Sequence, residues 1–399
     1  MDAKADIKPL TGLRGAAALA VAAYHLLLPG ALIHGTPARL LGRAYLAVDI
    51  FFILSGFVLA LNYGAWFTQG AQPAACARFL WRRFARIYPL YVTILAARLI
   101  YTQLRYGTFA LPRPWIAVPL AHPAATIAAN LAMVQAWGVA PSITGPSWSI
   151  SAECAAYIAF PLLAAAMLGR RHARIALACI AASALLLVAV TWLPAPPGHP
   201  RMLDVSDGET PGPLMRCLAG FIIGIAICRL AAWAPARRLA AHPASTLLVL
   251  LALAALLLTG ASDLAIYPLF PALVLCLACA RTGPAMLLAR PAAVWLGEIS
   301  YALYLLHIFL LHPIDVTRAA ARLILPPACA DAATSLGMLA LLLAAAHVAT
   351  RLIDEPGRRF LSAPPHARLA GSAPNPMIHQ QNAGARPWRM PPHPTPQKP

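Results

Sequence analysis

Apolar runs long enough to cross a membrane recur along most of the chain. Each holds about 17 to 22 residues, and short breaks rich in Arg or Pro separate one run from the next. Such runs predict an all-α, polytopic membrane protein. We expect about ten transmembrane helices, at 10–32, 44–64, 88–102, 149–168, 174–193, 214–232, 244–260, 264–280, 293–312 and 333–351.

Basic residues in the breaks orient these helices, because Lys and Arg accumulate in the cytoplasmic loops of membrane proteins. The strongest such signal follows the second run and contains Arg78, Arg82, Arg83 and Arg86. With the first helix starting inside, the other basic breaks fall on the same side. This orientation predicts that both termini are cytoplasmic.

The segment 103–147 interrupts this alternation. Its apolar part is broken by Pro119 and Pro123, and a full crossing would put the basic stretch 169–174 outside. We therefore predict an outer-side insertion with a re-entrant or interfacial piece. Membrane proteins allow such backbone where it lines a protein cavity.

Beyond the last apolar run, the chain is rich in Pro and polar residues and lacks apolar periodicity. Such a segment cannot bury enough apolar surface to fold alone. We therefore expect two regions, a transmembrane domain over 1–362 and a disordered cytoplasmic tail over 363–399.

The composition argues against a nucleic-acid-binding protein and against a protein built around metal sites or disulfides. Only 11% of residues are charged, and the formal net charge of +18 comes from basic residues spread between apolar runs rather than gathered in one patch. Eight cysteines are scattered, and Cys276 and Cys279 form an isolated CxxC pair. We predict no nucleic-acid partner, no metal site and no disulfide framework.

Arg14 and His25 are ionisable residues inside the first apolar run. They are eleven residues apart, which is three helical turns plus about 20°, so both side chains point to one face. An ionisable residue in a span costs roughly 2.5–3.5 kcal/mol and normally faces a polar cavity or a partner. The alternatives are an Arg that snorkels to the interface and a His that bonds a backbone carbonyl. The shared face favours a site.

More titratable residues fall at a similar depth in the predicted topology. Asp49, Glu153 and His307 join His25 in the outer half of the membrane, which indicates one polar cavity. A helix-packing hydrogen bond is the alternative for Asp49, and a core position is the alternative for His307. Arg14 and the arginine cluster mark the cytoplasmic end. This topology would separate the cluster from His25 by much of the bilayer.

Six motifs occur in the order found in a known family: LTGLRGAAALAVAAYH, VDIFFILSGF, RRFARIYPLY, GPSWSISAECAAYIAFPLL, LGEISYALYLLH and LIDEPGRRF. Over 7–360 the chain resembles the acyltransferase-3 family of integral-membrane O-acyltransferases. That family includes O-antigen and exopolysaccharide acetylases, nodulation-factor acetyltransferases and macrolide acyltransferases. The resemblance implies a core of ten helices.

The resemblance also implies roles for individual residues. The implied catalytic residues are His25, Arg14 and Glu153, the first two being the family's Arg-x10-His pair. The family's basic motif implies acyl-CoA binding by Arg82, Arg83 and Arg86. The implied supporting or acceptor-binding residues are Asp49, Trp148, Ser149, Tyr157, Ser300, Tyr304 and His307. Cys154 stands where the family has an acid or an amide, so that position receives no role.

We therefore expect an acyl-CoA-dependent O-acyltransferase of a bacterial cytoplasmic (inner) membrane. It would move an acyl group, most simply acetyl, from acyl-CoA as co-substrate to a hydroxyl of a carbohydrate or glycoside such as a surface polysaccharide, without a bound cofactor. His25 has a suitable pKa for the base, and Glu153 or Asp49 could orient its imidazole. The rival is a proton-coupled transporter of a small solute or glycan precursor with these residues as its relay, although the inverted repeats of many transporters are not visible.

Overall fold

The structure is a computed structural model. The residues it describes are 7–27, 35–112, 117–169, 173–193, 203–205 and 210–362. The predicted tail, 363–399, lies outside these residues, as do the end of the first predicted helix and most of 194–213, between two predicted helices.

Helices make up most of the described chain, which confirms the predicted fold class. Seven helical segments are long and apolar enough to cross a membrane. Their main helices are α1 (Lys8–Leu27), α3 (Ala47–Tyr63), α4 (Pro73–Tyr106), α6 (Trp148–Leu168), α8 (Gly212–Ala232), α13 (Pro291–Leu306) and α15 (Pro327–Ala349).

Two bent helix pairs raise the number of candidate spans among the described residues to nine. The first joins α9 (Ala234–Ala241) to α10 (Pro243–Thr259) with a bend of 72°. In the second, the bend of 82° separates α11 (Asp263–Ile266) and α12 (Leu269–Cys279) from η3 (Gly283–Ala289). A shorter apolar helix, α7 (Ala173–Val190), is the counterpart of the remaining predicted run. The predicted count of ten is therefore approximate.

Short elements connect the spans. The helical ones are α2 (Gly35–Leu41), η1 (Ala44–Leu46), η2 (Gly64–Trp66), α5 (Pro123–Leu131), η4 (His307–Leu310), α14 (Leu311–Ala321), η5 (Thr350–Asp354) and α16 (Glu355–Ser362). Strands β1 (Ala110–Pro112) and β2 (Ala117–Pro119) form a small antiparallel hairpin that the sequence did not predict.

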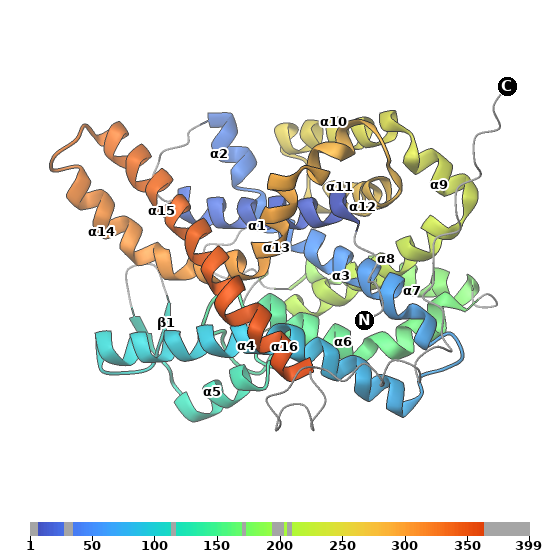
Figure 1. Cartoon of the computed structure of the whole chain (residues 1–399), viewed down its shortest axis with the longest axis horizontal. Coiled ribbons are helices and arrows are strands. Elements are labelled where there is room, and N and C mark those ends of the chain that lie inside the picture. Colours follow the sequence, from blue (N-terminus) through green and yellow to red (C-terminus); the bar gives the residue numbers. More distant parts are fainter. Residues whose placement is uncertain are drawn as a thin grey trace.

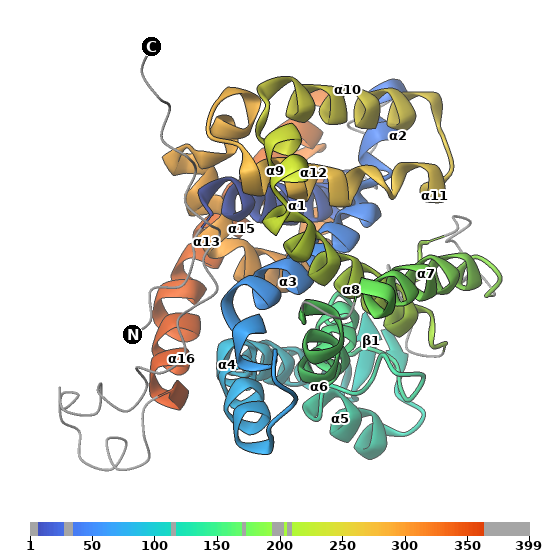
Figure 2. The same ribbon diagram turned by 90° about the vertical axis from the view of Figure 1, so that its right-hand side faces the viewer.

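The helices form three tiers in Figure 1. The α9, α10 and α12 group lies at the top, α4, α5 and α6 lie at the bottom, and α1, α3, α8 and α13 pass between them. Figure 2 shows the same tiers from the side. The middle tier is therefore enclosed on both faces, and the candidate site residues lie on it and on α4 and α6 of the bottom tier.

Glycines let the helices of the middle tier cross at close range. A Cβ on Gly15 of α1 would overlap the backbone of Gly297 of α13, and a Cβ on Gly56 of α3 would overlap the backbone of Phe221 of α8. Small residues allow backbones to approach closely in membrane helices, where dispersion contacts replace the hydrophobic driving force. These two crossings fix α1 against α13 and α3 against α8.

α4 differs from the sequence prediction, which began a helix at residue 88. The structure begins it at Pro73 and continues it through Pro89, so the arginine cluster lies on the helix rather than in a loop before it. Arg86 is thirteen residues from the helix start, or about 20 Å along the axis. Aromatic side chains beside the arginines, described below, allow this deeper position.

The insertion 103–147 packs against α4 and α6, and its described residues contain no helix long enough to cross. The Tyr91 hydroxyl of α4 donates to the Asn130 carbonyl at 2.6 Å. The amide nitrogen of Ala136 donates to Ser151 of α6 at 3.0 Å. These bonds satisfy irregular backbone inside the protein, as expected for a segment that enters without spanning.

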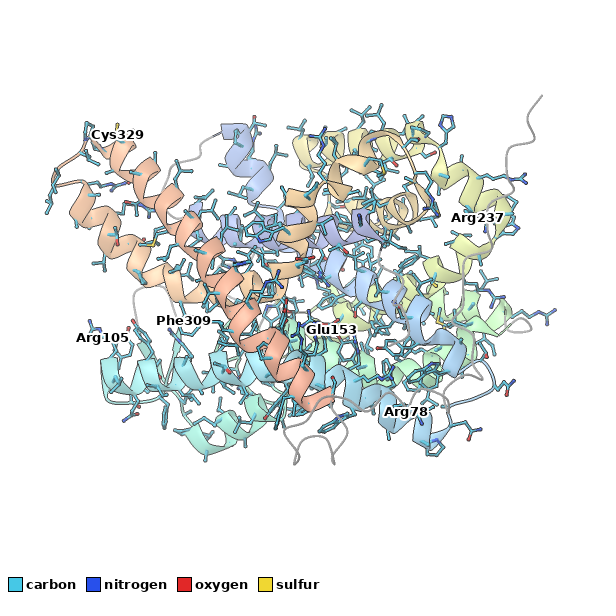
Figure 3. All side chains as sticks on the ribbon, in the orientation of Figure 1. Arg78, Arg105, Glu153, Arg237, Phe309 and Cys329 are labelled. Atoms are coloured by element: carbon cyan, nitrogen blue, oxygen red, sulfur yellow. The ribbon has the colours of Figure 1, made fainter. Side chains whose placement is uncertain are left out.

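Labelled side chains mark the two ends of the molecule in Figure 3. Arg105 and Cys329 lie at one end, and Arg78 and Arg237 lie at the other, with Glu153 between them. We call these the Arg105 end and the Arg78 end.

Candidate active site

Arg14 joins α1 to α13 through one backbone carbonyl. Its guanidinium donates to the Gly297 carbonyl at 2.7 Å, and the Ser300 hydroxyl donates to the same oxygen at 2.7 Å. The close crossing at Gly15 brings the two helices within this reach. The structure therefore brings together Arg14 and Ser300, which the sequence placed in separate motifs.

His25 and His307 face each other across the same helix pair. Their ring centroids are 4.8 Å apart. His25 Nδ1 lies 2.9 Å from the Val21 carbonyl, and His307 Nδ1 lies 2.6 Å from the Tyr304 carbonyl. A carbonyl only accepts hydrogen bonds, so Nδ1 carries the proton in both neutral rings and the basic lone pair is on Nε2.

Tyr304 and Ser149 form a hydroxyl pair beside the histidines. Their oxygens are 2.9 Å apart, and both lie within bonding distance of the Pro146 carbonyl, at 3.2 Å for Tyr304 and 3.1 Å for Ser149. The Tyr304 ring is 5.9 Å from the His307 ring. The pair holds two polar donors close to the imidazoles.

Glu153 lies one turn along α6 from Ser149 and is half-buried. Tyr157, which is buried, interacts through its hydroxyl with Glu153 and with Ser55. The Arg83 guanidinium lies 5.9 Å from the centre of the Tyr157 ring. Glu153 is therefore linked through Tyr157 to the arginine cluster.

The arginines of α4 lie over aromatic rings. The Arg82 guanidinium is 5.0 Å from the centre of the Trp66 ring. The Arg83 guanidinium, besides its contact with Tyr157, is 5.4 Å from the centre of the Tyr63 ring. Arg86 is 5.4 Å from the Tyr301 ring centre. Aromatic faces attract guanidinium groups, which stabilises these cations inside an apolar helix bundle.

A stripe on α13 connects this cluster to the histidine pair. Tyr301, Tyr304 and His307 follow one another at intervals of three residues, and they contact Arg86, Ser149 and His25 respectively. Six residues of helix rise about 9 Å. The predicted separation by much of the bilayer is therefore wrong, because the cluster lies well inside α4 and not at its start.

Asp49 bonds a neighbouring helix, which is the helix-packing alternative that the sequence left open for it. Both of its oxygens accept from Arg216 of α8, at 2.8 and 2.6 Å, and the two side chains are 0% and 1% exposed. The Val21 carbonyl lies at Nδ1 of His25 and orients the ring at that atom. Orientation of the imidazole by Glu153 stays a prediction. Asp49 instead holds α3 to α8.

Trp148 lies between this ion pair and the hydroxyl pair. Arg216 is 5.7 Å from the Trp148 ring centre, and Phe52 meets that ring edge-on at 6.1 Å. Trp148 is buried, so in this structure its ring packs against protein side chains. Through it, the Asp49–Arg216 pair supports the start of α6.

Sequence reasoning missed two partners. Arg216 is a charged residue inside an apolar run, the same signal that identified Arg14. Asp354 accepts from Arg86 at 3.0 and 2.9 Å, and it belongs to the motif LIDEPGRRF, to which no role had been given.

The arrangement suits group transfer by general base catalysis. It offers a basic imidazole nitrogen and two neighbouring hydroxyl donors at one end of a stripe whose other end contacts the cation of Arg86. Among the described residues, His, Cys, Asp and Glu form no group of three that could hold a metal ion.

Comparison with known proteins identifies relatives. A family model described as an acyltransferase domain matches residues 7–347. "Acyltransferase MdmB" of Streptomyces mycarofaciens is 38% identical over 167 residues, which cover 38% of this chain and 38% of that protein. "Protein 2 in picA locus" of Rhizobium radiobacter is 41% identical over 109 residues, 26% of this chain and 50% of that protein. The matched regions span half or less of these relatives, and no solved structure matches.

Proposed function

We propose, from the premise that this chain belongs to the acyltransferase domain family, that it is an acyl-CoA-dependent O-acyltransferase. It moves an acyl group, most simply acetyl, to a hydroxyl of a carbohydrate or glycoside acceptor in a bacterial cytoplasmic membrane. The many apolar helices fit a multi-pass membrane protein.

The observation that carries this proposal is the tautomer of His25. With Nδ1 donating to the Val21 carbonyl, Nε2 carries the basic lone pair and can take a proton as a general base. In the proposed step Nε2 removes the proton from the acceptor hydroxyl as its oxygen attacks the thioester carbonyl. The C–S bond then breaks, and the proton passes to the departing CoA thiolate.

Two neighbouring groups support the same step. The hydroxyls of Tyr304 and Ser149 can donate to the carbonyl oxygen as negative charge develops on it, which is the contribution expected of an oxyanion hole. Arg14 holds α1 against α13 through the Gly297 carbonyl and so keeps His25 beside that hydroxyl pair. Arg14 therefore acts by positioning the base.

The donor phosphates belong at the arginine cluster. Arg82 is exposed, and Arg83 is half-buried with an Nε that has no hydrogen-bond partner among the described residues. Guanidinium groups bind phosphate oxygens in a fixed fork. The stripe from Tyr301 to His307 gives the pantetheine arm a short path from these arginines to the base.

The family match favours this enzyme over a proton-coupled transporter. The test is incubation of the purified protein, in a bilayer of neutral lipid, with radiolabelled acetyl-CoA and a set of glycan and glycoside acceptors. The proposal predicts release of free CoA thiol together with label on an acceptor. Intact acetyl-CoA combined with pH-dependent solute uptake would establish the transporter instead.

A further inference from the structure

The C-terminal helix α16 returns to the arginine cluster of α4. Figures 1 and 2 show α16 beside α4. Trp81 of α4 donates from its indole nitrogen to the Leu361 carbonyl at 3.0 Å. Gly357 faces Pro89 so closely that a Cβ there would collide with the proline ring. The helix is therefore seated on α4 at both of its ends.

Arg86 is the residue that fixes this contact. Its guanidinium donates to both oxygens of Asp354, which is buried, while its own side chain is 20% exposed. The carboxylate compensates the charge of Arg86. Arg86 is thus committed to holding the start of α16 against α4, and little of its charge is available for a ligand.

Arg358 lies one helical turn beyond Asp354 and makes no such bidentate pair. It is half-buried, and its charge faces Arg86 as well as Asp354. No hydrogen bond or ion pair joins Arg358 to any described residue, whereas its neighbours Arg351 and Arg359 both pair with Glu355. Asp354 is already bonded to Arg86, and Glu355 is paired with Arg351 and Arg359, so Arg358 has its hydrogen-bond donors available for a further anion.

We propose that Arg358 binds a phosphate group of the acyl-CoA and completes, with Arg82 and Arg83, a donor-phosphate site between α4 and α16. This inference rests on the proposed function, because it assigns a residue to the donor of that reaction. Arg82 and Arg83 lie on the turn of α4 before Arg86, and Arg86 is the member of the cluster that contacts Asp354 at the start of α16. In this arrangement Arg86 and Asp354 position the site, and Arg358 contacts the ligand.

Phosphate oxygens at this place come from either of two sources, the donor or the headgroup of a phospholipid. A bilayer of purely zwitterionic lipid separates the two. In such bilayers the donor KM, the acceptor KM and kcat are measured for the wild type, for Arg358→Ala and for the matched control Arg359→Ala, whose side chain is 78% exposed. Binding of CoA alone is measured by calorimetry.

The proposal predicts that Arg358→Ala raises the donor KM and the CoA dissociation constant by roughly tenfold or more, which corresponds to the loss of one charge-assisted pair. The acceptor KM and kcat stay within about twofold, because only ground-state binding is lost. Arg359→Ala matches the wild type. Arg358→Lys keeps the positive charge but loses the paired N–H donors of the guanidinium, so it should give an intermediate donor KM. This variant also tests the proposal if Arg358→Ala does not fold.

Three results would overturn the proposal in distinguishable ways. If the wild type neither binds CoA nor turns over its thioester, the proposed function itself fails. If the wild type is active and Arg358→Ala and Arg358→Lys keep its donor KM, the function stands and the assignment of Arg358 is wrong. If those variants lose only a stimulation by anionic phospholipid, the residue binds a lipid headgroup.

Discussion

The imidazole rings of His25 and His307 lie 4.8 Å apart, and each donates from Nδ1 to a carbonyl of its own helix. The Nε2 atom of His307 is buried and has no hydrogen-bond partner among the described residues. The two imidazole rings, which share one tautomer, thus lie at the end of the stripe that Tyr301 begins on α13. His307 forms one wall around the proposed base.

Removing this wall should impair the chemical step more than binding. We expect His307→Ala to lower kcat about tenfold or more, because small displacements of a catalytic group are costly, and to leave the donor KM within about twofold. Steady-state kinetics with acetyl-CoA measures both values. His347→Ala is the matched control, since His347 accepts from Trp295 at 3.2 Å on another part of α13. Equal kcat values for the two variants would contradict the role given to His307.

The Asp49–Arg216 pair should behave as a structural bond. Breaking a buried pair by removing one partner costs about 3–5 kcal/mol, because a charge is left buried. Asp49→Ala should therefore lower Tm sharply in a detergent melting assay. The double variant Asp49→Leu with Arg216→Met should recover much of the loss. A Glu355→Ala control, which breaks exposed pairs with Arg351 and Arg359, should change Tm little.

The crossing of α1 and α13 should not tolerate a methyl group. A Cβ on Gly297 would overlap the Thr11 backbone, whereas a Cβ on Gly337 of α15 meets nothing within 4 Å. We expect Gly297→Ala to lower Tm and activity together, because it forces Arg14 and His25 away from α13. Gly337→Ala should raise stability by up to about 1 kcal/mol through a better helix propensity. A harmless Gly297→Ala would mean that the crossing is looser than described.

The orientation of the chain can be tested with thiol labelling. Cys329 is exposed at the Arg105 end, and Val139 of the insertion is 60% exposed. In a background lacking other cysteines, Cys329 and Val139→Cys should each react with an impermeant reagent applied to intact spheroplasts. Arg78→Cys should react only after the membrane is opened. The reverse pattern would invert the topology, and opposite results for Val139→Cys and Cys329 would mean that the insertion crosses the membrane.

Much of the fold could be predicted because the signal is local. In a membrane, a long apolar run forms a helix whichever segments pack beside it, because only a helix satisfies its backbone hydrogen bonds internally. All ten predicted runs therefore correspond to helices. Arg14 and His25 stood out for the related reason that single ionisable groups are rare in such runs. Arg216 gives the same signal, but its role was missed because the whole run 214–232 was treated only as a membrane-spanning helix.

Partners far apart in the sequence could not be predicted in the same way. Asp49 and Arg216 are separated by 167 positions, and Arg86 and Asp354 by 268. Which acid meets which base depends on the packing of α3 with α8 and of α4 with the last turn. The depth of the arginine cluster was also hidden, because the charge rule reads arginines as loop residues and takes no account of aromatic rings from other helices.

The central claim is that the Nε2 atom of His25 takes the proton of the acceptor hydroxyl. The most direct test is the rate of acyl transfer from acetyl-CoA by His25→Ala in the reconstituted bilayer, with CoA binding measured on the same preparation. We predict a fall in kcat of about 10²–10⁴, the usual contribution of a general base, with an unchanged dissociation constant for CoA. Turnover close to that of the wild type would contradict the account.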